Sequence, residues 1–468
     1  MPTIRLFKHY IQFSYMLLLL VEALVIGASL EVAIGLRSFI EGEPYYANFS
    51  DHVRVSVVFV VIMILSLVAM GLYHRQLREG VSGMLIRLAV ALVAGVLLTK
   101  LAFLTFRGLD VYFPFTLAAA FSAIGIVLSR WLFLSLVDLE RIKRQVLVLG
   151  TGKSAALIDN RLRRRTDRRG FHIVDYIHIS SEGSTETLGP ANSITLNEPL
   201  IRYARRRRVD EIVVALDERR KELPISELLD CKLGGIAVIE LATFFEREAS
   251  RIELDVRASW IVFSDGFRRG ALVRAIKRFF DLFISSVLII LTLPLMLLTA
   301  AAISIESKGR GPLFYRQMRM GEEGKPFKLM KFRSMVENAE KDGIARWAQR
   351  NDSRVTKVGA FIRRTRLDEL PQLWNVLYGD MSFVGPRPER PEFVCNLQKN
   401  IPYYQERLRV KPGMTGWAQI CYPYGASEKD AFAKLEFDLY YVKNYSIFLD
   451  LTILLRTAEV VLLGKGVR

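Results

Sequence analysis

The chain has 468 residues, enough for about three domains of the usual size. Its formal net charge is +17, and hydrophobic residues make up 51% of it while charged residues make up 24%. This composition excludes a disordered chain and a disulfide-stapled mini-protein. A simple soluble enzyme is not expected either, because the apolar residues gather in long runs. The three cysteines, Cys231, Cys395 and Cys421, form no CxxC pair, which argues against zinc and suits a reducing compartment.

Four apolar runs in the first part of the chain have the length of membrane-spanning helices. They cover residues 11–36, 55–72, 88–106 and 112–137, and each reaches roughly the 17–25 residues that a bilayer requires. The first run is too long for a cleaved signal peptide. Basic residues before the first span and after the fourth place both ends of this region in the cytoplasm. We therefore predict a four-helix transmembrane domain over residues 1–140.

Two acidic residues, Glu22 and Glu31, fall inside the first predicted span. An ionisable residue within a membrane is a functional candidate, because its burial in hydrocarbon is costly. The alternative is a structural role, with each side chain facing the helix bundle or the membrane interface. The sequence favours neither interpretation.

A middle domain that alternates strands and helices follows, over residues 141–250. An apolar strand pattern at residues 146–149 leads into the sequence GTGKSA, which starts at Gly150. This is G-x-G-x-x-A between a strand and a helix, the setting that the dinucleotide-binding fingerprint requires. Further strands are predicted at residues 173–177, 211–216 and 236–241. The pattern indicates a Rossmann-like α/β domain.

The same loop makes nucleotide binding a candidate function of this domain. Gly150 and Gly152 are the candidate cofactor-binding residues, and Asp175 is the nearest acid at a ribose-contacting spacing, although it lies in mid-strand. The arginine-rich stretches of the domain are typical of a solvated or headgroup-facing surface. Two interpretations stay open: a nucleotide-binding domain, and a domain with a structural or regulatory role.

A linker over residues 251–278 leads to an apolar segment at residues 279–305, which we predict to enter the membrane and return. Pro294 lies near its middle, where proline removes a helical hydrogen bond and bends or breaks the helix. Both flanks are basic, with Lys277 and Arg278 before the segment and a cluster from Lys308 onwards after it. A crossing helix would carry that second cluster to the outer face, against the positive-inside bias. The alternative is a fifth spanning helix.

The residues that indicate chemistry lie in the remaining part, residues 306–468. Asp368 and Glu369 precede Pro371, which is typical of a helix start. With Arg363 nearby, this helix start is typical of a phosphate site, and a carboxylate placed there is expected to stay ionised and to ligate Mg²⁺ or attack phosphorus. A second motif, Pro386-Arg387-Pro388, fixes an arginine on a stiff backbone that could hold an anionic group.

Four sequence blocks in this part carry a family resemblance: KFRSM from Lys331, LDELPQLWNV from Leu367, GDMSFVGPRP from Gly379 and KPGMTGWAQ from Lys411. Together they closely resemble the bacterial polyprenyl-phosphate phosphoglycosyl transferases of the monotopic superfamily. The whole chain is similar to the long form, the exopolysaccharide-type initiating sugar transferases. The implied fold is a membrane α-helical bundle, a Rossmann-like middle domain and a mixed α/β catalytic domain with a re-entrant membrane helix.

The resemblance implies transfer of a sugar 1-phosphate from a UDP-sugar to undecaprenyl phosphate, with release of UMP. Asp368 matches the nucleophile that forms a covalent phosphosugar intermediate, and it is also the expected Mg²⁺ ligand. Glu369 matches the residue that assists with the metal or the acceptor phosphate. Pro294 matches the proline that bends the re-entrant helix; the family often has serine before it, where this chain has Leu293. Substrate-binding residues are then Lys331, Arg333, Arg363, Pro386, Arg387 and Pro388.

The implied partners are the two substrates and the lipid bilayer, and the implied location is the bacterial inner membrane with a cytoplasmic catalytic domain. A homodimer through the middle or membrane domain is reasonable. No nucleic-acid recognition module is visible, so the net charge is better explained by anionic lipids and phosphates. The implied process is the initiation of exopolysaccharide repeat units.

Two other classes of protein are weighed against this one. Membrane-bound sugar-nucleotide dehydratases need a Tyr-x-x-x-Lys pair, and none of the 17 tyrosines has a lysine four residues on. The second class is a membrane-bound, nucleotide-sensing scaffold that regulates polysaccharide export, which the Rossmann-like domain would suit. The intact setting of Asp368 and Glu369 argues against a scaffold.

Overall fold

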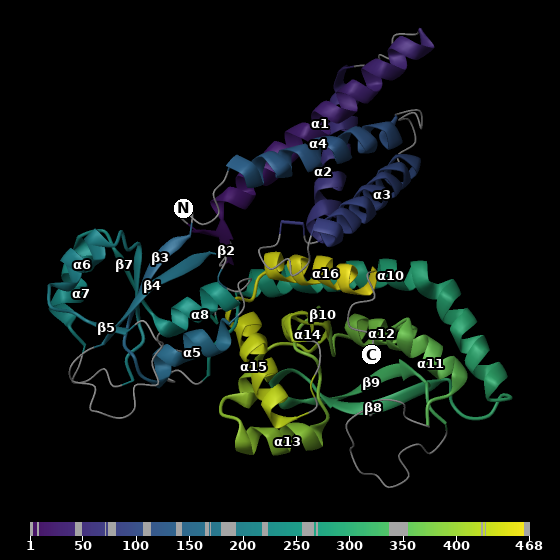
Figure 1. Cartoon of the computed structure of the whole chain (residues 1–468). Helices are drawn as coiled ribbons and strands as arrows, with labels where there is room; N and C mark the ends of the chain where they lie inside the picture. Colours follow the sequence, from purple (N-terminus) through teal and green to yellow (C-terminus); the bar gives the residue numbers. More distant parts are fainter. Residues whose placement is uncertain are drawn as a thin grey trace. The chain divides into compact units, whose positions relative to one another are not determined.

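The computed structural model describes residues 3–6, 9–42, 49–70, 72–73, 81–105, 114–136, 143–163, 168, 170–178, 193–217, 223–254, 266–267, 270–336, 354–422, 425 and 427–462. Several of the loop charges that orient the predicted spans lie outside these residues. The chain divides into two units, Met1–Ser250 and Arg251–Arg468, and each is described by itself (Figure 1).

The N-terminal unit begins with a short hairpin and four apolar helices. The hairpin pairs β1 (Thr3–Leu6) with β2 (His9–Gln12). The helices are α1 (Phe13–Glu41), α2 (Phe49–Ala69), α3 (Val81–Thr105) and α4 (Phe115–Leu136). By length and composition, α1, α3 and α4 could each cross a membrane, whereas the apolar part of α2, Val53–Ala69, is shorter. Each predicted span is therefore present as a helix.

A buried ion pair joins the first and last of these helices. The Glu22 carboxylate on α1 accepts hydrogen bonds from Arg130 Nε at 2.6 Å and Nη2 at 3.0 Å, and Arg130 lies on α4. Tyr73 Oη donates to the same carboxylate at 2.5 Å. Because a charge in an apolar bundle must be paired to be tolerated, these contacts favour a structural role for Glu22. Glu31 accepts a hydrogen bond from Ser56 Oγ at 3.3 Å.

The second part of this unit is a five-stranded parallel sheet with helices on both sides. The strands are β3 (Arg144–Leu149), β4 (Phe171–His178), β5 (Ser193–Thr195), β6 (Glu211–Val214) and β7 (Ala237–Glu240), in the order β5-β4-β3-β6-β7. The helices α6 (Leu200–Arg206) and α7 (Ile225–Leu233) lie on one side of the sheet, and α5 (Lys153–Arg161) and α8 (Leu241–Ala249) on the other (Figure 1). Numbered along the chain, this order is 3-2-1-4-5, the Rossmann order without its sixth strand, which confirms the predicted α/β middle domain.

The C-terminal unit packs short strands and helices against one long helix. In chain order, its elements are α10 (Ala271–Glu306), β8 (Phe314–Met320), η1 (Glu322–Gly324), β9 (Pro326–Phe332), α11 (Lys357–Arg364), η2 (Leu367–Glu369), α12 (Gln372–Tyr378), β10 (Ser382–Val384), α13 (Pro391–Asn400), η3 (Tyr404–Arg409), β11 (Gly413–Thr415), α14 (Trp417–Cys421), α15 (Glu428–Lys443) and α16 (Ile447–Leu462). Strands β8 and β9 form an antiparallel hairpin, and β10 pairs with β11 in parallel.

The main core of this unit includes residues from the segment predicted as a linker. Ile252 and Leu254 are buried with Leu435, Tyr441 and other apolar side chains of α15 and α16. Burial of these two side chains removes apolar surface from water and so contributes to the stability of the unit. The predicted linker is thus in part a core segment.

Helix α10 contains the predicted apolar segment but begins at Ala271 rather than at residue 279. Pro294 lies inside it, and the helix changes direction along its length (Figure 1). Proline removes a hydrogen bond and crowds the carbonyl one turn before it, which bends a helix. Leu293 cannot donate to the Ile290 carbonyl, which Pro294 leaves without its helical donor. The Thr292 hydroxyl, one position earlier, donates to a different carbonyl, that of Leu288, at 2.6 Å.

The first part of α10 is fixed to the unit by buried polar contacts. Lys277 Nζ contacts Asp450 Oδ2 at 2.5 Å, and Asp281 Oδ1 accepts hydrogen bonds from Ser382 Oγ and from the Phe383 amide, both at 3.0 Å. Arg278 donates to two carbonyls at the end of α12, at 2.6 and 2.7 Å. Lys277 and Arg278, predicted as a basic flank, are therefore part of the folded unit.

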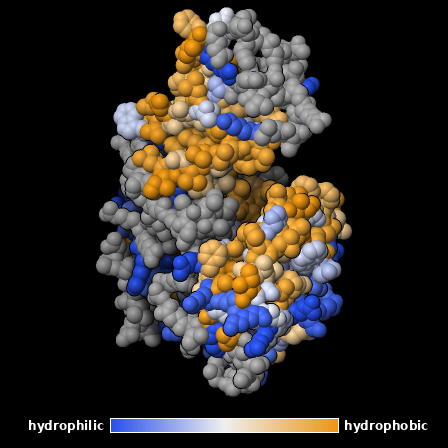
Figure 2. Space-filling model, turned by 90° about the vertical axis from the view of Figure 1, so that its right-hand side faces the viewer, coloured by the Kyte–Doolittle hydropathy of each residue, from blue (hydrophilic) through white to orange (hydrophobic). Residues whose placement is uncertain are grey.

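The last part of α10 contacts the same unit. The Glu306 carboxylate accepts hydrogen bonds from the backbone amides of Lys357, at 2.8 Å, and Val358, at 3.2 Å, at the start of α11. Met296 and Ile303 are buried against apolar residues of β9 and α11. In between, large apolar side chains of α10 are 60–71% exposed, namely Phe283, Ile290, Leu291, Leu297 and Leu298. Figure 2 shows hydrophobic side chains gathered in the area of α10, next to hydrophilic ones.

Candidate active site

Three separate elements bring one carboxylate and two cations into contact. Glu369 lies at the end of η2, Lys331 on β9, and Arg387 on the loop that follows β10. Lys331 Nζ is 2.9 Å and Arg387 Nη2 is 3.0 Å from Glu369 Oε1. Asp368 precedes Glu369 and is buried. Four predicted site residues therefore come together in one cluster.

The local backbone explains how the two acids reach this place. Helix α11 starts at the cap residue Thr356, whose hydroxyl oxygen accepts a hydrogen bond from the Gly359 amide at 2.9 Å. Arg366, just before η2, has a left-handed backbone with φ of 60°, a conformation that costs energy for any residue except glycine. This turn separates α11 from η2 and directs Asp368 inward. Pro371 then occupies the N-cap position of α12, so a helix starts where predicted, but Asp368 and Glu369 lie in η2 just before it.

Lys331 is positioned by a side chain that continues the sheet. The buried Asn375 on α12 accepts a hydrogen bond from the Met330 amide at 3.0 Å and donates to the Lys328 carbonyl at 2.9 Å. The amide side chain thus satisfies the free edge of β9, as a neighbouring strand would. Because α12 follows η2 directly, this contact fixes Lys331 relative to Glu369.

The two neighbouring carboxyls differ in their electrostatic surroundings. Burial and the charge of Glu369 raise the pKa of Asp368 above its usual value, and nearby cations only partly offset this. Burial by itself would raise the pKa of Glu369 too, but Lys331 and Arg387 outweigh it and hold that pKa far below the usual range. Burial in turn lowers the pKa of Lys331.

The structure distinguishes the two acids: the pKa of Glu369 is lowered and that of Asp368 is raised. The reason is geometric, since both cations of the cluster contact Glu369. Within the described residues, the Asp368 carboxylate makes no hydrogen bond or ion pair. Within the described part of the chain, two cations therefore hold one carboxylate of the pair, and its neighbour has no such contact.

The other predicted site residues lie around this cluster. Arg363 is in the last turn of α11, and its charge acts on Asp368. Pro386 and Pro388 are buried on either side of Arg387. Arg333 follows β9, and its Nη2 donates to the Arg310 carbonyl at 2.9 Å; no described contact joins it to the two acids.

The fit of a magnesium ion is limited by the number of protein ligands. Among the described residues, no group of three or more acidic, histidine or cysteine side chains could hold a metal. Asp368 and Glu369 supply two carboxylates, and Glu369 is already paired with two cations. Magnesium is commonly bound by one or two carboxylates together with substrate phosphates and water, so Asp368 fits an ion that arrives with a diphosphate.

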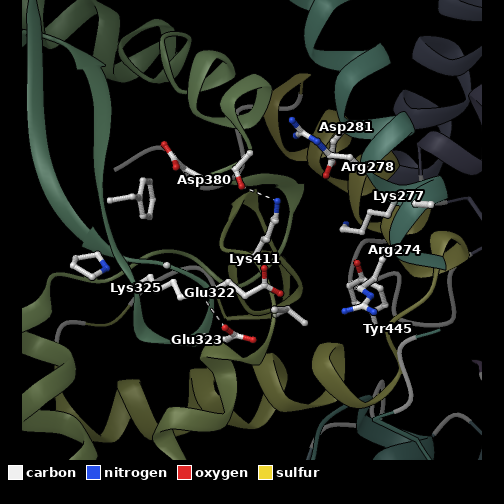
Figure 3. A pocket seen from close by; sticks show the side chains of 16 residues that line it. Arg274, Lys277, Arg278, Asp281, Glu322, Glu323, Lys325, Asp380, Lys411 and Tyr445 are labelled. Carbon is white, nitrogen blue, oxygen red and sulfur yellow. Dashed lines mark hydrogen bonds and ion pairs between the residues drawn. The ribbon is translucent and has the colours of Figure 1, made fainter. Parts of the chain in front are cut away.

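A cavity of about 680 Å³ lies elsewhere in this unit, lined by α10, the turn between β8 and β9, and the end of α12. None of the predicted site residues lines it. Figure 3 shows Lys411 reaching across it; its Nζ donates to the Gly379 carbonyl at 2.7 Å. Arg278 also bonds to carbonyls at the end of α12. These cations bind carbonyls at the end of a helix, which stabilises that end. Because no predicted site residue lines the cavity, the carboxylate cluster is the candidate site.

The glycine-rich loop of the middle domain is filled by a side chain of the same domain. The Asp217 carboxylate accepts hydrogen bonds from the backbone amides of Lys153 and Ser154, both at 2.8 Å, at the start of α5. A Cβ atom at Gly152 would lie 2.2 Å from Asp217 Oδ2. The start of this helix is where a dinucleotide diphosphate binds in Rossmann domains. In this chain an aspartate occupies that position.

Contacts within the middle domain also account for Gly150 and Asp175 without a nucleotide. Gly150 has a φ of +122°, and a Cβ atom there would lie 2.5 Å from the Ala215 carbonyl oxygen. Asp175 Oδ2 accepts hydrogen bonds from Tyr203 Oη at 2.7 Å and from Arg207 Nη2 at 2.8 Å. The geometry at these positions favours a structural or regulatory role for the middle domain over nucleotide binding.

Several residues that shape the candidate site carry no signal in the sequence. Asn375 lies in the sequence block LDELPQLWNV, but this block does not reveal that its side chain bonds to β9. Asp281, Arg407 and Asp438 are single charged residues whose burial and partners only the fold reveals. A charged residue at a helical core position is a weak indication of such a role.

Comparisons with known proteins agree with this architecture. The family described as bacterial sugar transferase matches residues 272–464, which contain all but the first residue of α10 and the whole carboxylate cluster. The family described as CoA-binding domain matches residues 68–230, which contain most of the Rossmann-like sheet.

Similar curated proteins come from several bacteria. UDP-glucose:undecaprenyl-phosphate glucose-1-phosphate transferase of Escherichia coli is 33% identical over 67% of this chain and 67% of its own length. The protein of the same name from Klebsiella pneumoniae is 37% identical over 62% of this chain and 61% of its own length. UDP-N-acetylgalactosamine-undecaprenyl-phosphate N-acetylgalactosaminephosphotransferase of Aeromonas hydrophila is 41% identical over 52% and 56%. The last two are thus matched over less than two thirds of their length.

Apolar helices, a Rossmann-like sheet and a carboxylate–cation cluster define a membrane protein with a site suited to phosphate esters. More particularly, the chain belongs to the bacterial sugar transferase family, in the long form that carries a CoA-binding-like domain. The residues of that second domain do not fit the diphosphate of coenzyme A at the helix start, because Asp217 already bonds to its free amides.

Proposed function

We propose that this chain transfers a sugar 1-phosphate from a UDP-sugar to undecaprenyl phosphate and so initiates the synthesis of a polysaccharide repeat unit. One observation carries the proposal: Glu369 is held between Lys331 and Arg387, while the adjacent Asp368 carboxylate has no described partner. An uncommitted carboxylate beside fixed cations suits nucleophilic attack on a diphosphate. The names of the curated relatives support the two substrates.

In the proposed reaction, an oxygen of Asp368 attacks the phosphorus atom that carries the sugar. The bond between this phosphorus and the bridging oxygen breaks, and UMP leaves with that oxygen. An oxygen of undecaprenyl phosphate then attacks the same phosphorus and releases Asp368. Lys331, Arg387 and Arg363 offset the negative charge that gathers in both steps.

Magnesium is proposed as the metal of this site, held by Asp368 and the substrate diphosphate. When bound, it supplies further positive charge for a reaction between anionic groups. We expect activity to vanish in EDTA and to return when excess Mg²⁺ is added, as measured by transfer of labelled sugar phosphate to lipid. EDTA that has first been saturated with Mg²⁺ is the control. Full activity in metal-free EDTA would rule out this role.

Helix α10 is proposed to dip into the membrane and return to the same side. Its 36 residues would span about 54 Å if straight, against the ~30 Å of a hydrocarbon core. Asp281 near its start and Glu306 at its end both bond to the same folded unit. A straight crossing would place these two contacts on opposite faces of the bilayer. The exposed apolar residues between them suit contact with lipid.

This placement puts the site next to its lipid substrate. The return part of α10 packs on α11 and β9, which lead to Asp368 and Lys331. We propose that the catalytic unit lies on the cytoplasmic side of the bacterial inner membrane, where UDP-sugars are found. Its partners are then the bilayer and the two substrates.

The direct test is transfer of radiolabelled sugar phosphate from UDP-sugars to undecaprenyl phosphate by the purified full chain in detergent or nanodiscs. We expect labelled lipid and an equal amount of UMP with at least one UDP-sugar. Comparison of several UDP-sugars identifies the sugar. Absence of transfer from all of them, with a folded protein, would contradict the proposal and favour a scaffold.

The raised pKa of Asp368 has a consequence for the pH profile. Attack requires the ionised carboxylate, so the rate should fall as the pH decreases through this pKa, at a higher pH than for an ordinary aspartate. In Glu369→Gln, a negative charge that raises the pKa is gone, so this acid limb should move to lower pH. The measurement is kcat/KM against pH for both proteins. An unchanged limb in the variant would contradict this assignment.

A further inference from the structure

The loop that carries Arg387 has four consecutive backbone carbonyls, and each is held by a hydrogen bond. The first and last, of Pro386 and Glu389, accept from the backbone amides of Gly413 and Met320, both at 2.9 Å. These donors belong to β11 and β8, so the loop joins two separate parts of the unit. The two carbonyls between them are held by side chains instead.

Two arginines supply these side-chain donors. Arg319 Nη1 donates to the Pro388 carbonyl at 3.1 Å, and Arg407 Nη2 donates to the Arg387 carbonyl at 3.0 Å. The second contact acts on the residue that reaches Glu369. The orientation of this carbonyl sets the backbone angle ψ of Arg387, while the proline on each side restricts the neighbouring angles.

The Arg407 guanidinium is itself fixed by other groups. Its Nε and Nη2 contact Asp438 Oδ2 at 3.0 and 2.8 Å, and its Nη1 donates to Tyr404 Oη at 3.1 Å. The planar fork leaves one Nη2 hydrogen directed at the Arg387 carbonyl, a geometry that a lysine ammonium could not reproduce.

Burial of the Arg407–Asp438 ion pair costs desolvation energy, which suggests that the pair has a function besides stability. The side chains of Arg407 and Asp438 are only 6% and 3% exposed. Desolvation of two such charges offsets much of their attraction, so a buried ion pair is often no more stabilising than apolar side chains of the same size. What apolar side chains could not supply is a donor for the Arg387 carbonyl.

We propose that Arg407 and Asp438 are positioning residues that hold Arg387 in place for the diphosphate of the UDP-sugar, an inference that rests on the proposed function. The Arg387 side chain is 42% exposed, and its described side-chain partner is Glu369. Its position is therefore set by Glu369 and by its backbone. Without the Arg407 contact, the Arg387 carbonyl loses its donor and the backbone of Arg387 can change conformation. The Arg387 guanidinium then moves away from the substrate phosphates.

The test compares Arg407→Met with the double variant Arg407→Met/Asp438→Leu. In the single variant, the buried Asp438 loses its partner, so a lower Tm is expected as well as a higher KM for the UDP-sugar. In the double variant, apolar packing restores the Tm while the carbonyl donor is still missing. We expect kcat/KM for the UDP-sugar to stay about 10- to 100-fold below wild type, as small misplacements of a binding group cause. The KM for the lipid acceptor should not change.

A matched control is Arg409→Met on the same short helix, since Arg409 pairs with Glu406 at the surface. It should leave both KM values unchanged. A double variant that regains the wild-type KM together with its Tm would show a purely structural role and overturn the inference. A wild-type chain that transfers nothing would overturn the proposed function, and the inference with it.

Discussion

Asp368→Asn should abolish transfer of sugar phosphate to lipid while leaving the fold intact. The amide keeps the shape of the carboxylate but removes the nucleophilic oxygen charge, so we expect a loss of about a thousandfold or more, the order seen when a covalent nucleophile is removed. The fold should tolerate the change, because Asp368 is buried and makes no described polar contact that asparagine would lose. The measurement is the labelled transfer assay, with the Tm recorded in parallel.

A trapped intermediate separates the two neighbouring acids. When the chain is incubated with UDP-sugar alone, mass spectrometry should find a phosphosugar on the peptide that contains Asp368. The adduct should be absent in Asp368→Asn. It should still form in Glu369→Gln, only more slowly, since that variant keeps the nucleophile and loses the anchor for Lys331 and Arg387. Transfer by Asp368→Asn at a near wild-type rate would contradict the covalent mechanism.

The order of the elements could be predicted from the sequence because it depends on local patterns. The apolar runs gave the N-terminal helices, and the strand pattern before Gly150 gave the start of the Rossmann-like sheet. Pro371 marked the start of α12. Each of these signals lies within a window of a few residues, where propensity and periodicity operate.

Long-range charge pairs could not be predicted in the same way. Lys277 contacts Asp450, 173 residues further on, and in the sequence it is one of many basic residues near a membrane segment. Arg407 and Asp438 are likewise ordinary charged residues until the fold buries them together. Local patterns contain no information on such partners, because the contact depends on how whole elements pack.

In the candidate site, too, the local motif could be predicted from the sequence, whereas the long-range contacts could not. The motif places Asp368 and Glu369 next to each other, but it does not say which of them the cations will contact. That choice follows from Asn375, which fixes β9 and so brings Lys331 to Glu369. In the middle domain, the glycine pattern left both nucleotide binding and a structural or regulatory role open, and Asp217, more than sixty residues along the chain, fills the loop. Neither outcome follows from motif spacing.

The membrane topology of α10 can be tested with single cysteines at its two ends. In a background without Cys231, Cys395 and Cys421, we introduce Ala271→Cys or Lys308→Cys. If α10 enters and returns, both sites should resist an impermeant thiol reagent on intact spheroplasts and react after lysis. Labelling at position 308 from outside, with position 271 protected, would instead mean a fifth spanning helix.

Replacing Pro294 by leucine should push α10 towards a straight crossing. The change restores a helical hydrogen bond at a site where proline costs about 3 kcal/mol or more in a helix interior. The contacts of Asp281 and Glu306 with the folded unit oppose the crossing, so we expect a mixed population in which a fraction of the 308 site becomes accessible from outside. This fraction should be inactive, because its site is separated from cytoplasmic UDP-sugars. Leu291→Ala, an exposed change on the same helix, is the control and should leave both sites protected.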